Sequence, residues 1–166
     1  MRTAALIVAA GMSSRMGQFK PMLNIGSITI AQRVVDTFRQ AGIRKIVMVT
    51  GYNAVMLERH LAGSDVIFLR NDRYETTQMF DSVKIGLAYL QEKCDRVLFT
   101  PVDIPLFTSR TVMALLACSS ARMYYVPVED PGTLYDADTP VDYSTLVERH
   151  NSQPVFPGER SCALEE

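Results

Sequence analysis

The sequence predicts an α/β protein, a three-layer sandwich around a mostly parallel, Rossmann-like sheet. Two observations support this prediction. Short apolar runs without polar alternation recur along the chain, and such runs are typical of strands buried on both faces. Between them lie stretches whose apolar residues repeat with helical spacing. This alternation of strands and helices builds a parallel sheet with helices on both faces.

The predicted strands are the apolar runs themselves. The first run, AALIVA at residues 4–9, is followed closely by Gly11, which ends the extended stretch. Similar runs read KIVMVT, DVIFL, RVLFTP and MYYVPV at residues 45–50, 65–69, 96–101 and 123–128.

The predicted helices lie between and after these runs. In residues 30–38, the apolar positions follow the i, i+4, i+5, i+8 rhythm of one helix face. The same rhythm recurs at residues 55–61, 79–90 and 112–117. A last helix is predicted at residues 141–150, after an acidic, turn-rich stretch.

Length and composition indicate one ordinary globular domain. The chain has 166 residues, of which 48% are hydrophobic and 21% charged, and this composition excludes a disordered protein. Seventeen basic and eighteen acidic residues leave a net charge of −1, so no global basic field attracts nucleic acid or an anionic membrane. We expect one domain over residues 1–150 and a tail, or the start of an absent second domain, over residues 151–166.

The cysteines and the N-terminal residues favour a cytoplasmic protein. Cys94, Cys118 and Cys162 are odd in number and lie outside any CxxC pattern, which argues against a disulfide framework and a zinc site. The apolar run at residues 4–10 is too short to span a membrane, and only Arg2 supplies positive charge before it. We therefore expect neither a signal peptide nor a membrane span.

A long loop follows the first predicted strand. Residues 10–27 fill eighteen positions, whereas a strand-to-helix connection usually takes about 2–6. Arg15 can hold a phosphate through two hydrogen bonds, and Lys20 can add a charge further along a polyphosphate. The spacing suits a nucleoside triphosphate but is neither a Walker P-loop nor GxGxxG, and the alternative is a surface loop with solvated charges. The candidate binding residues are Gly11, Ser13, Ser14, Arg15, Gly17 and Lys20.

An acidic residue follows the strand predicted at residues 96–101. Asp103 lies between two prolines, at the carboxyl edge of the sheet where parallel α/β proteins bind ligands. A polyphosphate needs a divalent cation, and Mg²⁺ is held by one or two carboxylates together with phosphate oxygens. Asp103 is therefore the predicted Mg²⁺ ligand. The alternative is that Asp103 caps a helix beginning near Thr108, for which it lies too early.

Two further acidic residues occur in the sequence DADTP at residues 136–140. We predict Asp136 as the second metal ligand, on the grounds of alternation. For Asp138 the competing interpretation is a helix start, because Asp-Thr-Pro before a helix places proline in the first turn.

Polar residues after the third predicted strand are candidates for contacting the nucleoside. Asn71 stands at the strand end, and Ser82 lies in the helix predicted next. Their side chains are suited to hydrogen-bonding a base or a ribose. The alternative is that Asn71 and Asp72 simply form a turn.

The sequence LIVAAGMSSRMGQFKPML at residues 6–23 resembles the signature of the nucleotidyltransferases with a glycosyltransferase-A-like fold. Within this MobA-like family it is most similar to the molybdenum cofactor cytidylyltransferase and guanylyltransferase group. TPVDIP at residues 100–105 looks like the family's metal-binding motif, and DADTP looks like its closing motif. The resemblance covers residues 3–150 and implies a fold like that of the nucleotide-diphospho-sugar transferases.

The resemblance implies an Mg²⁺-dependent reaction in which the acceptor's phosphate attacks the α-phosphorus of a nucleoside triphosphate and pyrophosphate leaves. Arg15 and Lys20 would stabilise charge on the phosphates, and Asp103 would hold Mg²⁺. Ala-Ala-Gly is similar to the cytidylyl branch, which points to CTP rather than GTP. The acceptor would be a phosphorylated pterin cofactor of the molybdopterin type, with a molybdoenzyme or its chaperone as partner. By matching position, the base and sugar would contact Ala9, Ala10 and Gly11.

Two departures from the family pattern leave other functions open. Members usually carry several tens of acceptor-side residues, with a Gly-His-Pro-type segment, where residues 126–129 here run directly into the closing motif. The second departure is MFDS at residues 79–82, where many relatives have a glycine before the serine-containing helix, and nucleotide selectivity could differ there. One alternative is a sugar-phosphate or polyol-phosphate nucleotidyltransferase, and another is a module that senses a nucleotide or the cofactor without catalysis.

Overall fold

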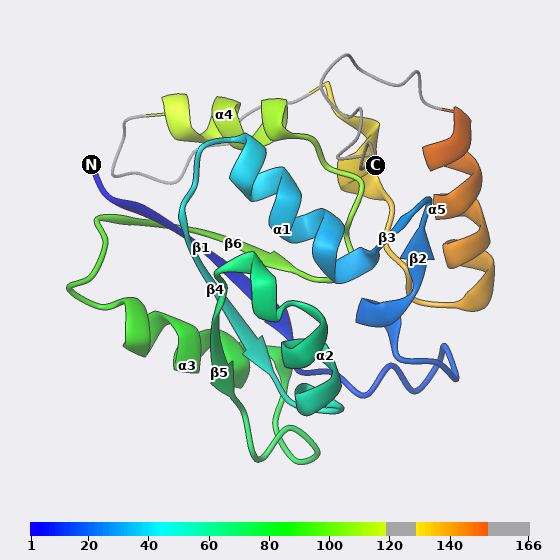
Figure 1. Ribbon diagram of the computed structural model, residues 1–166, viewed down its shortest axis with the longest axis horizontal. Coiled ribbons are helices and arrows are strands. Elements are labelled where there is room, and N and C mark those ends of the chain that lie inside the picture. Colours follow the sequence, from blue (N-terminus) through cyan, green and yellow to red (C-terminus); the bar gives the residue numbers. More distant parts are fainter. Residues whose placement is uncertain (119–128, 153–166) are drawn as a thin grey trace, which may run out of the picture.

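The computed structural model describes residues 1–118 and 129–152 (Figure 1). A four-stranded parallel sheet forms its centre, with the strand order β5-β4-β1-β6. Each connection between consecutive strands of this sheet contains one or more helices, as is usual for parallel strands. The sheet strands are β1 (Thr3–Ala9), β4 (Lys45–Thr50), β5 (Ile67–Arg70) and β6 (Arg96–Pro101).

Helices cover both faces of this sheet. Figure 1 shows α1 and α4 on one side and α3 on the other. Among the described residues, no helix has the length and apolar character needed to cross a membrane. The helices are α1 (Ile30–Gln40), α2 (Ala54–His60), α3 (Met79–Leu90), α4 (Ser109–Ala117) and α5 (Pro140–Ser152), with single 3₁₀ turns η1 (Lys20–Met22), η2 (Ala62–Ser64) and η3 (Pro131–Leu134).

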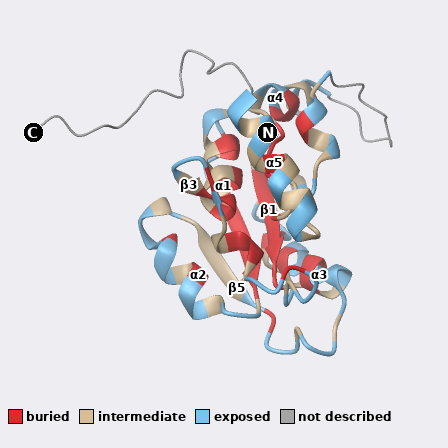
Figure 2. Cartoon of the chain, turned by 90° about the vertical axis from the view of Figure 1, so that its right-hand side faces the viewer, coloured by how far each residue is buried: buried red, intermediate tan, exposed pale blue. Residues whose placement is uncertain are grey.

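Strand β1 separates two hydrophobic cores, and Figure 2 shows it buried along its length. Successive side chains of a strand point to opposite faces, so Ile7 packs with α1 while Leu6 packs with α3. Gly86 of α3 lies directly on Leu6, and an added Cβ would come within 2.2 Å of its Cδ1 atom. This close approach explains a glycine in the middle of a helix. The three-layer α/β sandwich predicted from the sequence is confirmed.

Most elements occur where the sequence predicts them, and two differ. Strand β5 begins two residues late because Asp65 adopts a left-handed conformation, with φ of 50°, that ends η2. The long loop after β1 contains η1 and a small hairpin of β2 (Asn24–Ile25) and β3 (Ile28–Thr29), which turns at Gly26 with φ of 63°. The strand predicted at residues 123–128 lies outside the described residues.

Candidate functional site

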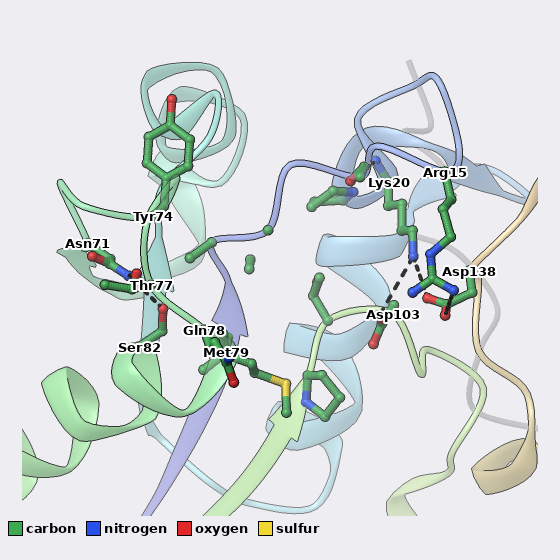
Figure 3. Close-up of a pocket in the computed structure, with 18 residues that line it drawn as sticks. Arg15, Lys20, Asn71, Tyr74, Thr77, Gln78, Met79, Ser82, Asp103 and Asp138 are labelled. Atoms are coloured by element: carbon green, nitrogen blue, oxygen red, sulfur yellow. Dashed lines mark hydrogen bonds and ion pairs between the residues drawn. The ribbon is translucent and has the colours of Figure 1, made fainter.

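A cavity of about 270 Å³ opens at the carboxyl ends of β1, β5 and β6. Figure 3 shows that it has two chemically different ends. Carboxylate and cationic side chains gather at one end, and amide and hydroxyl groups gather at the other. This is the edge at which parallel α/β sheets bind their ligands.

At the charged end, Lys20 lies between two carboxylates. Its Nζ atom is 2.7 Å from Oδ1 of Asp138 and 3.8 Å from Oδ2 of Asp103. Arg15 approaches from the solvent side, with Nη1 3.2 Å from Oδ2 of Asp138. The side chain of Lys20 is only 11% exposed, whereas that of Arg15 is 74% exposed. Lys20 is therefore part of the cavity wall, and Arg15 lies at its solvent-exposed rim.

The loop that carries Lys20 is held by its own hydrogen bonds. The backbone N–H of Lys20 donates to Oγ of Ser13, and the N–H of Met16 donates to the carbonyl of Ser13. Ser13 adopts a left-handed conformation with φ of 52°, and the Met16 side chain is buried. Pro21 then fixes the first turn of η1. These contacts point Lys20 inward across the edge of the sheet.

The two carboxylates differ in their ionisation. Burial raises the pKa of Asp103, and the attraction of Lys20 only partly offsets that effect. The hydrogen bond from Lys20 is the main cause that lowers the pKa of Asp138, with the charge of Arg15 assisting. The charged form of Asp103 is thus disfavoured by its surroundings, and Lys20 compensates for this only in part. Such a group gains from a further cation beside it.

At the uncharged end, Asn71 organises the loop between β5 and α3. Its Nδ2 atom donates to Oγ1 of Thr77 at 2.8 Å and to Oγ of Ser82 at 3.0 Å. Its Oδ1 atom accepts from the backbone N–H of Arg73, which is an Asx turn. Asn71 and Ser82 both line the cavity, but Asn71 has both amide hydrogens engaged within the protein. The turn-forming role weighed from the sequence is present in the structure.

Replacing Asn71 by Ala is expected to destabilise the fold by about 1–3 kcal/mol, because the buried hydroxyl of Ser82 and the half-buried hydroxyl of Thr77 lose a hydrogen-bond partner. Thermal unfolding measures this loss, with a fall of several degrees for a chain of this size. Asp72→Ala is the matched control, since its exposed side chain lies next in sequence. Equal melting temperatures for the two variants would contradict the assigned role.

The structure brings most predicted site residues to one cavity. Asp103, Arg15 and Lys20 line it together with Asn71 and Ser82. Ser14 is exposed and is not part of the cavity wall. The other predicted residues that line the cavity are Ala9, Ala10, Gly11 and Ser13.

The geometry favours Asp138 over Asp136, which the sequence predicts as the second metal ligand. Asp136 is exposed and lies outside the cavity wall, whereas Asp138 lines it. The intervening Ala137 is fully buried, and its N–H donates to the carbonyl of Asp103 at 2.9 Å. This bond fixes the direction of the chain, so that Asp138 faces Asp103.

Asp138 does not cap a helix, which is the competing interpretation of this residue from the sequence. Thr139 caps α5, because its Oγ1 atom accepts from the N–H of Asp142, whose carboxylate accepts from the N–H of Thr139. This reciprocal pair frees the carboxylate of Asp138 for the cavity. A Thr-x-x-Asp spacing in the sequence is the signal that locates this cap.

The chain resembles proteins of one family throughout its described core. The family model for the MobA-like NTP transferase domain matches residues 5–159. Bifunctional protein GlmU of Geobacillus sp. (strain WCH70) is 29% identical over 147 residues, which are 86% of this chain and 30% of that protein. GlmU of Staphylococcus epidermidis is 24% identical over 91% of this chain and 32% of its own length. The chain thus spans about a third of these curated relatives.

Solved structures share the fold. The Rv0371c homologue from Mycobacterium sp. strain JC1 superposes with a TM-score of 0.70 at 16% identity, over 90% of this chain and 97% of that one. A nucleotidyl transferase from Methanothermobacter, Mth528, superposes with a TM-score of 0.59 at 26% identity, over 67% and 55%. The chain belongs to the MobA-like NTP transferase domain family.

Proposed function

We propose that this protein is an Mg²⁺-dependent nucleotidyltransferase that moves CMP from CTP onto the phosphate of a molybdopterin-type cofactor and releases pyrophosphate. One observation carries the proposal: Arg15 and Lys20 meet the carboxylates of Asp103 and Asp138 at one end of a cavity whose other end is uncharged. A nucleoside triphosphate has the same division into a charged and an uncharged half.

The donor set at the charged end suits Mg²⁺. Mg²⁺ prefers hard oxygen ligands and is usually held by one or two carboxylates together with substrate phosphates and waters. Asp103 and Asp138 supply two such carboxylates, and the Lys20 ammonium already lies between them. In the described residues, no group of three or more His, Cys, Asp or Glu could hold a metal ion by itself, so the proposed site needs substrate phosphates as further ligands. When bound, Mg²⁺ would neutralise charge on the phosphates.

The residues of the chain would position the triphosphate and stabilise its charge. Arg15 is exposed enough to swing onto a phosphate and grip it with two hydrogen bonds. Lys20 would interact with charge that develops as the bond to pyrophosphate breaks. The exposed backbone of Gly11 has no atom within 4 Å of the place where a Cβ would be, so a ligand can approach it closely.

The preference for CTP rests on the Ala-Ala-Gly sequence at residues 9–11, which line the cavity. Among the solved structures of this fold are a CTP:phosphocholine cytidylyltransferase of Streptococcus pneumoniae and a CMP-ketodeoxyoctonate synthetase solved with CTP. Both are less than 25% identical to this chain, so they support the fold and leave the acceptor open. The second candidate is a sugar-phosphate nucleotidyltransferase, which would use the same division of the cavity into a charged and an uncharged end.

The first test is a thermal-shift panel with CTP, GTP, UTP and ATP, each with and without Mg²⁺. A ligand at 100 times its dissociation constant stabilises by about 2.7 kcal/mol, which raises the melting temperature of a chain this size by about 5–10 °C. We expect CTP with Mg²⁺ to give the largest shift. Arg15→Gln should reduce that shift, whereas Arg44→Gln, which removes an exposed cation elsewhere, should not.

Acceptors are then compared by pyrophosphate release from the preferred nucleotide. Release with a phosphorylated pterin, and not with sugar phosphates, supports the proposed acceptor. Release only with a sugar phosphate establishes the second candidate instead. A nucleotide-dependent thermal shift without release from any acceptor indicates a sensing module.

A further inference from the structure

Residues 130–138, called the strap here, connect the N-terminus of α4 to the charged end of the cavity. The strap contains η3 and lies against the loop that runs from Asp103 to Thr108. In Figure 1 it is the yellow segment between α4 and α5. It ends at Asp138, so its path determines where that carboxylate lies.

Asp130 fixes the far end of the strap. Its Oδ2 atom accepts hydrogen bonds from the N–H of Thr108 at 2.7 Å, from Oγ1 of Thr108 at 2.9 Å and from Oγ1 of Thr111. Its Oδ1 atom accepts from the N–H of Gly132 at 3.1 Å. Burial alone would raise the pKa of Asp130, but these four donors together hold it below its usual value. The carboxylate therefore stays ionised and fully bonded at neutral pH.

Two further contacts press the strap onto the loop beneath it. Gly132 lies so close to Leu106 that an added Cβ would come within 1.9 Å of the Leu106 carbonyl oxygen. Nearer the cavity, the N–H of Ala137 donates to the carbonyl of Asp103 at 2.9 Å. The strap is thus attached at its beginning, in its middle and next to Asp138, always to the segment that carries Asp103.

We propose that Asp130 is a positioning residue, which sets the separation of the Asp103 and Asp138 carboxylates and thereby the affinity of the site for a divalent cation. Asp130 is absent from the cavity wall, so it acts only through the strap. The inference rests on the proposed function, because it assumes that these two carboxylates hold the metal. It assigns a role to a residue that composition and motif spacing did not single out.

The test measures binding of Mn²⁺ to the purified protein by electron paramagnetic resonance, with a non-hydrolysable CTP analogue present. Asp130→Ala is expected to weaken Mn²⁺ binding at least tenfold. Thr111→Val removes one of the four donors and should weaken it by a smaller factor. The dissociation constant of the CTP analogue in the absence of metal, measured by thermal shift, should change less than twofold in both variants.

Two controls separate positioning from a general loss of stability. Asp95→Ala removes another carboxylate that accepts from a backbone N–H and a guanidinium, both of Arg2, at the edge of the sheet where β6 begins and away from the cavity. Leu90→Ala removes a fully buried side chain from the core beneath α3. Both variants should bind Mn²⁺ as the wild-type protein does, even where their melting temperatures fall.

The outcomes distinguish this inference from the proposed function. Unchanged Mn²⁺ binding in Asp130→Ala, together with weakened binding in Asp138→Asn, would overturn the positioning role and leave the metal site in place. Mn²⁺ binding that is absent from the wild-type protein, or unaffected by Asp138→Asn, would overturn both. If Asp130→Ala does not fold, Thr111→Val replaces it: weakened Mn²⁺ binding supports the positioning role, and unchanged binding overturns it.

Discussion

Replacing Asp103 by Asn is expected to reduce Mg²⁺-dependent pyrophosphate release at least about 1,000-fold while leaving the fold intact. The amide keeps the shape of the side chain but has only one oxygen and no charge. A metal bound to phosphate contributes several kcal/mol to transition-state stabilisation, and each 1.36 kcal/mol corresponds to a factor of ten in rate. Steady-state pyrophosphate release at saturating CTP and Mg²⁺ measures the effect.

Stability should change in the opposite direction from activity. Burial raises the pKa of Asp103, which means that the folded protein disfavours its charged form at neutral pH. The neutral amide removes this unfavourable charge. It also breaks no hydrogen bond with Lys20, whose Nζ atom is 3.8 Å from Oδ2 of Asp103. The variant should therefore melt at the same temperature as the wild-type protein or above it. A joint loss of activity and stability would instead indicate a structural role.

Asp136→Asn is the matched control, because it changes a carboxylate of the same motif that lies outside the cavity. The geometry predicts near-wild-type release for this variant and a strong loss for Asp138→Asn. The reverse pattern would contradict the assignment of Asp138 and restore the second ligand predicted from the sequence.

The fold could be predicted from the sequence because its signals are local. An apolar run such as KIVMVT is buried on both faces only in a covered parallel sheet, and β4 occupies those residues. Loop conformations depend on single residues and are harder to foresee. Asp65 ends η2 in a left-handed conformation, and the turn-forming residues Gly63 and Ser64 before it are compatible with a strand that begins either at Asp65 or after it.

Two parts of the candidate site follow from different signals in the sequence: Arg15 and Lys20 belong to the long loop motif, and other residues lie just after a strand. Asp103 and Asn71 stand at strand ends, so their place at the edge of the sheet follows from the topology. The choice between Asp136 and Asp138 depends instead on a hydrogen bond from Ala137 to a segment more than thirty residues away. Asp130 was missed for the same reason, since its four donors are distant or backbone groups that spacing does not reveal.

Lys20→Met is expected to lower turnover by about 100- to 1,000-fold and to destabilise the protein at neutral pH. Removing one preorganised cation from a transition state of growing negative charge has an effect of this size. Methionine preserves most of the buried chain length, so the change removes mainly the charge. Kinetics at saturating Mg²⁺ measure the first effect, and thermal unfolding measures the second.

The stability loss should depend on pH in a defined direction. The Lys20 hydrogen bond lowers the folded-state pKa of Asp138 below 3.8, so it contributes stability that is present above that value and is lost as the pH falls through the lowered pKa. Without Lys20, the carboxylates of Asp103 and Asp138 repel each other near neutral pH. We expect this to lower the free energy of unfolding by about 1–3 kcal/mol. The effect is no larger because Asp138 is 31% exposed, so solvent screens part of the repulsion. Protonation of these carboxylates removes their repulsion, so the difference in melting temperature between variant and wild type should shrink toward pH 3.

Lys84→Met provides the control, because Lys84 is also paired with an aspartate but is 62% exposed. A surface pair of this kind contributes little to stability because solvent screens it, and its loss should leave turnover unchanged. A Lys20→Met variant whose stability deficit persists unchanged at pH 3 would show that lost packing, rather than lost charge, is the cause. A deficit that disappears in acid would show that Lys20 stabilises the protein through its charge, which lies between the carboxylates of Asp103 and Asp138 at the cavity edge.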